Sequence, residues 1–107
     1  MGFAYGKMRA GAGEEVGTGM RRDARTDKNQ SEIVRGLKEA CRSVVLLHRV
    51  GGGVPDLLVG FKGKMWLLEV KIEKGKLNDL QQDFFDTWRG PRPVVVRNLD
   101  DALEATK

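Results

Sequence analysis

Apolar positions recur along the chain in patterns that predict separate elements. From residue 30 they follow a helical period and form one stripe, made up of Ile33, Leu37, Ala40, Cys41 and Val44. We expect this stripe to be buried, with Asn29 or Ser31 capping the helix. Residues 43–49 are β-branched and apolar, which predicts a strand packed against that helix.

A second helical stripe lies in residues 77–88. Its members are Leu77, Leu80, Gln81, Phe84, Phe85 and Trp88. The spacing of the aromatic residues favours core packing over base stacking. The Gly-Pro-Arg-Pro stretch at 90–93 ends this helix, residues 93–96 read as a short strand, and residues 99–105 read as a last helix capped by Asn98.

Between these helices, residues 51–72 carry two short apolar runs separated by Lys62 and Gly63, which is a hairpin signal. If those two residues form the loop, counting outward sets Asp56 directly opposite Glu69. Opposed like charges destabilise a sheet, so a positive group is expected between them. A hairpin slipped by one residue would set Asp56 opposite Leu68 and disperse the cluster.

Strand alternation puts Glu69 and Lys71 on the face that Asp56 shares. Two carboxylates suit a hard cation such as Mg²⁺ or Mn²⁺, with the carbonyl of Val70 as a further ligand. Metal-assisted hydrolysis of a phosphodiester needs such a site, with Lys71 holding or deprotonating the attacking water. Taken singly, Glu69-Val70-Lys71 would more often be a solvated ion pair and Pro55-Asp56 a turn, but together at hairpin spacing they favour a phosphodiesterase centre.

Bulk properties restrict the classes that remain. The chain has 107 residues, 40% hydrophobic and 32% charged, which fits one small domain. The single Cys41 precludes an internal disulfide and fits an intracellular compartment. No apolar run suggests a membrane span or a signal peptide, and the glycines at 51–53 lack the lysine and serine of a nucleotide-binding loop.

Charge points to a polyanion partner. The formal net charge is +4, and the basic residues near the hairpin could follow a phosphate backbone, with flexible glycine allowing close approach. The expected nucleic-acid contacts are Arg49, Gly52, Lys62, Lys64, Lys74 and Lys76. Residues 1–28 are rich in Gly and charge without a period, so we expect a flexible arm before a folded domain at 29–107.

Pro55-Asp56 followed by Glu69-Val70-Lys71 resembles the signature of PD-(D/E)XK nucleases, and the stretch 53–57, Gly-Val-Pro-Asp-Leu, resembles the VRR-NUC branch. The resemblance runs from about residue 32 to about residue 103. It implies an α/β, restriction-endonuclease-like core in the order αβββαβα, a mixed β-sheet with a central hairpin flanked by helices. It also implies a metal-dependent DNA endonuclease.

The same resemblance suggests further site residues. A glutamate on the first helix of such nucleases points into the active site and matches Glu32, which could otherwise simply complement the helix dipole. Gln81 matches an active-site glutamine, although it could instead bond a strand-end carbonyl. The resemblance further implies a two-fold homodimer acting on branched or four-way-junction DNA in replication, recombination or repair, and a phage or bacterial origin with action in the cytoplasm.

Three hypotheses from different classes remain at this point. The first is a Mg²⁺- or Mn²⁺-dependent, structure-selective DNA endonuclease. The second is a catalytically idle nucleic-acid-binding module that keeps the nuclease fold. The third is a small metal-binding or interaction protein whose carboxylates are structural. The intact set of Asp56, Glu69 and Lys71 favours the first, because a module that only binds DNA gains nothing from carboxylates that repel phosphate.

Overall fold

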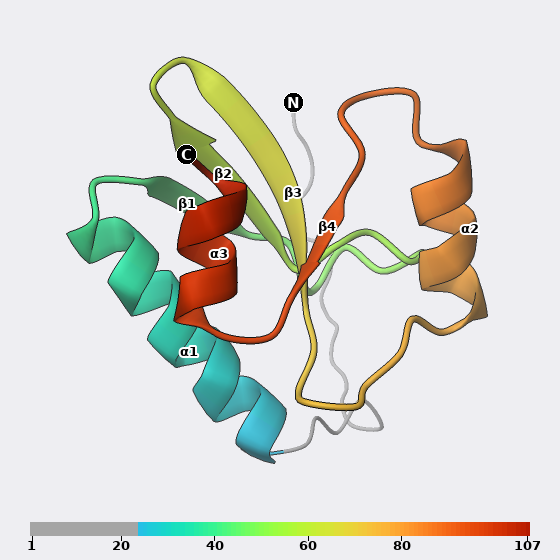
Figure 1. The fold of residues 1–107 in the computed structure, drawn as a ribbon. Coiled ribbons are helices and arrows are strands. Elements are labelled where there is room, and N and C mark those ends of the chain that lie inside the picture. Colours follow the sequence, from blue (N-terminus) through green and yellow to red (C-terminus); the bar gives the residue numbers. More distant parts are fainter. Residues whose placement is uncertain (1–23) are drawn as a thin grey trace.

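A four-stranded mixed sheet and three helices make up the part of the chain that the computed structural model describes, residues 24–107 (Figure 1). In chain order the elements are α1 (Ala24–Glu39), β1 (Ser43–Leu46), β2 (Leu57–Phe61), β3 (Lys64–Val70), α2 (Asp79–Thr87), β4 (Val94–Val96) and α3 (Leu99–Ala105). This is the predicted αβββαβα order. The predicted α/β class is therefore confirmed.

The strands lie in the order β1-β2-β3-β4, the first three antiparallel and the last parallel to β3. Phe61 pairs with Lys64, so Lys62 and Gly63 alone form the loop of the central hairpin. Both have positive φ, 53° and 78°, as the tight turns that suit twisted hairpins require. The predicted register of the hairpin is confirmed.

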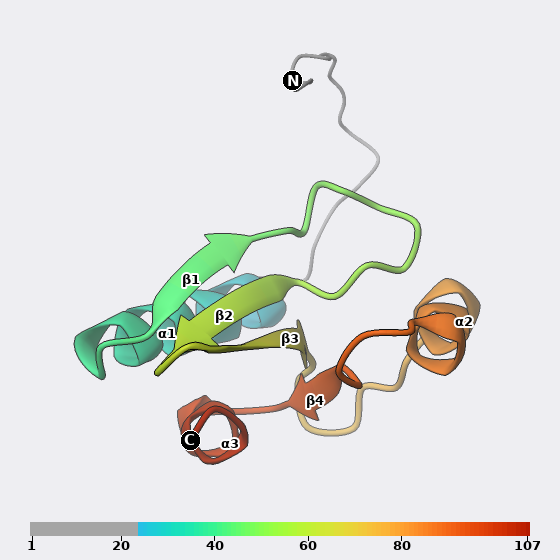
Figure 2. The same ribbon diagram turned by 90° about the horizontal axis from the view of Figure 1, so that it is seen from above.

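Helices α1 and α3 lie side by side on one face of the sheet (Figures 1 and 2). The fully buried side chains of this face come from every layer: Ile33 and Leu37 of α1, Leu57, Val59 and Leu68 of the hairpin, Val96 of β4 and Ala102 of α3. Burying such a set supplies most of the driving force for folding. This face holds the hydrophobic core.

The opposite face of the sheet is only partly covered. Helix α2 lies apart from α1 and α3 in both views (Figures 1 and 2). An apolar groove of about 430 Å³ is lined by Leu58, Met65 and Leu67 of the hairpin and by Phe84 and Trp88 at α2. Met65 is 57% exposed and Trp88 is 46% exposed. The prediction that Trp88 belongs to the core is wrong, because it caps the C-terminus of α2.

Helix α1 departs from the prediction at both ends. It begins at Ala24, so Asn29 lies inside it, and the Asn29 side chain donates to the carbonyl of Arg97 instead of capping the helix. At the other end, Cys41 has φ of 68° and the Arg42 N–H donates to the Leu37 carbonyl at 2.9 Å. This is a left-handed C-terminal cap. Cys41 is therefore exposed, and its predicted place in the core is wrong.

Two further boundaries bear on the predictions. Strand β1 ends at Leu46, because the chain turns at residues 48–50, where the Val50 N–H donates to the Leu47 carbonyl. The predicted flexible arm falls largely outside the described residues, and its last part, 24–28, is the first turn of α1. None of the helices formed by residues 24–107 has the length and apolar character needed to span a bilayer.

Candidate active site

Asp56 and Glu69 lie where the hairpin register predicts. Leu57 pairs with Leu68, and one step outward along the same ladder places Asp56, just before β2, beside Glu69 on β3. Both carboxylates are buried. Asp56 is oriented by β3 itself, since its Oδ2 accepts a hydrogen bond of 2.9 Å from the Val70 N–H. The two acids thus occupy one end of the central hairpin.

Burial gives Glu69 an unusual proton affinity. The residue is 2% exposed, and desolvation, followed by the negative charge of Asp56, raises its pKa to about 7, against the opposing effect of Lys71. Its buried Oε1 has no hydrogen-bond partner within residues 24–107. A buried carboxylate oxygen without a partner is costly. Its negative charge makes this position suitable for a cation.

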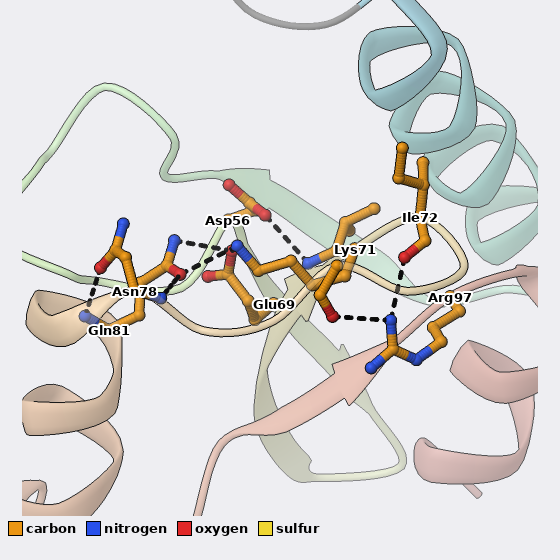
Figure 3. A network of polar contacts seen from close by, with 9 residues as sticks. Asp56, Glu69, Lys71, Ile72, Asn78, Gln81 and Arg97 are labelled. Atoms are coloured by element: carbon orange, nitrogen blue, oxygen red, sulfur yellow. Dashed lines mark hydrogen bonds and ion pairs between the residues drawn. The ribbon is translucent and has the colours of Figure 1, made fainter.

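A polar network joins Glu69 to helix α2 (Figure 3). The Lys71 ammonium lies 3.5 Å from Glu69 Oε2 and donates to Gln81 Oε1 at 2.9 Å. Gln81 Nε2 donates to Glu69 Oε2 at 3.1 Å. Lys71 thus lies alongside Glu69, and a positive group between the two acids stays a prediction. Gln81 bonds these two side chains, whereas the alternative reading had it bond a strand-end carbonyl.

The orientation of Gln81 is set by the start of α2. Asn78 caps the helix, accepting from the Gln81 N–H at 2.9 Å, while Gln81 Oε1 accepts from the Asn78 N–H at 2.9 Å. This reciprocal pair is a capping box. Because Oε1 faces two donors, its place in the amide group is fixed. Sequence reasoning missed Asn78, although its position three residues before Gln81 is the signal of such a box.

The glycine run at 51–53 supports α2. Gly53 has φ of 84°, and a Cβ there would overlap the backbone carbonyl of Leu80, so only glycine permits this approach. Gly52, expected to contact nucleic acid, is exposed and has open space around it. The close backbone contact made by the run is therefore with the first turn of α2.

The other predicted site residues are more dispersed. Glu32 pairs with Lys28 at 4.0 Å on the exposed side of α1. Within residues 24–107 no three His, Cys, Asp or Glu side chains are grouped as a metal site. Glu32 therefore does not complete a three-acid set with Asp56 and Glu69. The role of Glu32 as an outer ligand stays a prediction.

The basic residues divide between two ends of the molecule. Arg49 and Lys74 are exposed in the connections that flank the site end of the hairpin. Lys62 and Lys64 are exposed at its tip, which six residues of β3 separate from Val70, roughly 20 Å at the usual strand rise. A single phosphate cannot contact both groups. A continuous path along all four would need several nucleotides.

The residues present fit a divalent cation. Asp56 and Glu69 supply the oxygen donors that Mg²⁺ and Mn²⁺ prefer, and the partnerless Oε1 of Glu69 is the strongest sign of fit. Val70 contacts the site through its N–H, and its carbonyl stays a predicted ligand. Lys71 and Gln81 stand beside the acids, where they can orient water or phosphate.

Comparisons with known proteins agree with the fold. The sequence matches no protein-family model and no curated protein sequence. A solved structure titled VRR_NUC domain is similar, with a TM-score of 0.57 and 22% identity over 77% of this chain and 94% of that chain. At this identity the likeness shows the fold. The expected restriction-endonuclease-like architecture is thus confirmed.

Proposed function

We propose that this chain, which has the fold of the nuclease-type VRR-NUC domain, is a Mg²⁺- or Mn²⁺-dependent endonuclease that hydrolyses phosphodiester bonds in DNA. The observation that carries the proposal is the buried pair of Asp56 and Glu69 with Lys71 at its edge. The pKa of Glu69 is raised and its Oε1 has no hydrogen-bond partner within residues 24–107, so a bound cation would stabilise the charged form of this side chain.

Asp56 and Glu69 would hold the metal ion, with the Val70 carbonyl as a third donor. When bound, such an ion supplies Lewis acidity toward the phosphoryl oxygen and lowers the pKa of bound water. The chain's own residues do the rest. Asp56 is held in place by the Val70 N–H, so its carboxylate needs little reorganisation on binding.

Lys71 would act on the attacking water. Its ammonium stands 3.5 Å from Glu69 Oε2 and is held by Gln81 Oε1, so it can direct a water toward phosphorus and offset the charge that builds on the phosphate. Gln81 would keep this ammonium from turning to solvent, since its amide bonds Lys71 and Glu69 at once.

We propose branched DNA as the substrate and a second copy of the chain as the partner. A two-fold dimer would present two sites to one junction. The exposed apolar side chains on the α2 side of the sheet, Val45 and Met65 among them, are the candidate dimer surface. No described element resembles a major-groove reader, so selectivity would follow DNA shape.

Cleavage of plasmid, fork, linear duplex and four-way-junction DNA in Mg²⁺, Mn²⁺ or EDTA tests the activity. We expect cleavage of branched DNA that needs metal and that Glu69→Ala lacks. Asp83→Ala, an exposed acidic change on α2, is the matched control and should cut normally. Binding in Ca²⁺ without cleavage by the wild type in any metal would favour the idle binding module instead.

Titrations in Ca²⁺ test the DNA contacts separately. Affinity should fall with salt by about 0.9 log units per log unit of salt for each phosphate neutralised. Lys62→Ala and Lys74→Ala should each reduce that slope if both ends of the hairpin touch DNA. A strong preference for one linear sequence would contradict shape selectivity and favour a restriction-like enzyme.

A further inference from the structure

Arg97 lies directly after β4, and one nitrogen of its side chain donates to three backbone carbonyls. Its Nη1 donates to the carbonyl oxygens of Ile72, Glu73 and Gly75 at 2.9, 3.0 and 3.0 Å. Figure 3 shows its guanidinium beside Ile72, at the end of the site network. Convergent carbonyls of this kind need a cation or several donors, because buried or half-buried carbonyls without partners are costly.

All three carbonyls belong to the loop that joins β3 to α2. The loop begins at Lys71 and ends at Asn78, the cap that orients Gln81. The sheet fixes only its first residue, since the Lys71 N–H donates to the Val96 carbonyl at 3.0 Å. A tight turn follows, in which the Gly75 N–H donates to the Ile72 carbonyl at 2.8 Å. The Arg97 side chain bonds the carbonyl oxygens of this turn and so holds it against the end of β4.

Arg97 is itself fixed by the core side of the molecule. Its N–H donates to Asp101 Oδ2 of α3 at 2.9 Å, and its carbonyl accepts from Asn29 Nδ2 of α1 at 3.0 Å. Two helices far apart in the chain, α1 and α3, therefore hold the residue that holds the loop. The distance between Lys71 and Gln81 depends on that loop, because Lys71 begins it and Gln81 lies in the helical turn that follows it.

We infer that Arg97 is a positioning residue for the Lys71 and Gln81 pair, and that this role rests on the proposed nuclease function. Arg97 touches neither Asp56 nor Glu69 in any hydrogen bond or ion pair found among residues 24–107. Its loss should therefore leave metal and DNA binding intact and slow the chemical step. Positioning groups of this kind are worth about 10–100-fold in activity.

The chain offers a matched control in Arg42. Its guanidinium also bonds backbone carbonyls, those of Ala40 at 2.8 Å and Thr106 at 2.9 Å, and it lies 3.8 Å from the Phe61 ring centroid. Phe61 is at the far end of the hairpin from Glu69. Arg42→Ala thus removes similar bonds away from the site.

The experiment measures kcat and KM for four-way-junction cleavage in Mg²⁺, with melting temperatures, for both alanine variants and for Arg97→Lys. We expect both alanine variants to lose stability, while Arg97→Ala alone lowers kcat, by about 10–100-fold, with KM within about twofold. Arg97→Lys should recover part of kcat, because an ammonium offers three donors to the three carbonyls. If Arg97→Ala does not fold, Arg97→Gln takes its place.

A second measurement is independent of activity. The side-chain amide resonances of Gln81 report its bonds to Lys71 and Glu69, and we expect them to shift in Arg97→Ala and to stay in place in Arg42→Ala. Wild-type protein that cuts no DNA would refute the nuclease, and the resonances would still decide the role of Arg97. Unshifted resonances, or kcat equal in the two alanine variants, would overturn this inference.

Discussion

The two faces of the sheet are built from the same strands and serve different ends. On the α1 and α3 face, Leu57, Leu68 and Val96 are fully buried. On the α2 face, Leu58 and Leu67 line an open groove, and Glu69 is buried beyond them with a raised pKa. Apolar side chains from two helices cover the first face. The second face has an open groove, and its side chains are buried only near Glu69.

This difference shows how one short hairpin can form a packed core on one face and hold buried acids on the other. Alternation along β3 assigns Leu68 and Val70 to the core and Glu69 to the opposite side. Packing on the core face makes β3 rigid. A rigid strand can hold the Glu69 carboxylate in a buried position, where a mobile strand would let it turn to solvent. Substitutions on the two faces should therefore have separable effects on folding and on cleavage.

The largest expected effect is that of Asp56→Ala. It removes a metal donor and the acceptor of the Val70 N–H, so we expect no detectable DNA cleavage and weaker Mn²⁺ binding. Gel assays and calorimetry measure the two losses. Asp83→Ala, also an acidic residue, should change neither, and residual cleavage by Asp56→Ala near the wild-type rate would refute the assignment.

Lys71→Ala should separate binding from chemistry. The Mn²⁺ affinity should persist because both carboxylates remain, while kcat falls by roughly 10²–10⁴, the scale of a positioned proton-transfer group. Lys64→Ala, at the far end of β3, is the matched change and should leave kcat intact. Normal turnover by Lys71→Ala would mean that another group handles the water.

Leu68→Ala and Met65→Ala compare the two faces directly. Leu68 is fully buried, so its truncation should cost about 2–5 kcal/mol of the free energy of unfolding. Met65 is 57% exposed, and its truncation should cost less than about 1 kcal/mol in the monomer. Urea denaturation at low protein concentration measures both, and equal costs would contradict the division between the faces.

The last expected effect concerns pH. Because folding raises the Glu69 pKa from 4.5 to about 7, the folded state holds a proton that the unfolded state has released, so metal-free stability falls as pH rises across that range. Glu69→Gln removes this loss. In EDTA its free energy of unfolding should match that of the wild type near pH 4 and exceed it by roughly 3 kcal/mol at pH 8. An unchanging difference between the two proteins would contradict the raised pKa.

The sequence predicts the arrangement of the candidate site residues well where local rules act. The two-residue loop at Lys62 and Gly63 sets the register, and the register alone brings Asp56 to Glu69. Helical spacing likewise places Gln81 on the inner side of α2. These inferences need only period and turn chemistry, which neighbouring residues determine.

Contacts between distant segments escape such reasoning. Arg97 meets the β3–α2 loop 22 to 25 residues away, and Gly53 meets Leu80, with no period to link either pair. The prediction for Cys41 is wrong for another reason, because the helical period of the sequence continues past the residue where α1 ends. A helix cap formed by a residue other than glycine has no clear sequence signal. The exposure of Trp88, just after α2, has none either.

The central claim is that the buried acids form a cation site, and calorimetric titration of wild-type protein and Glu69→Gln with Mn²⁺ at pH 8 tests it most directly. Glutamine keeps the shape of the side chain and removes the charge left without a partner at Oε1. We predict that the wild type binds Mn²⁺ and that the variant binds at least about tenfold more weakly, a loss of about 1.4 kcal/mol. Equal binding by both proteins, or none by the wild type, would contradict this account.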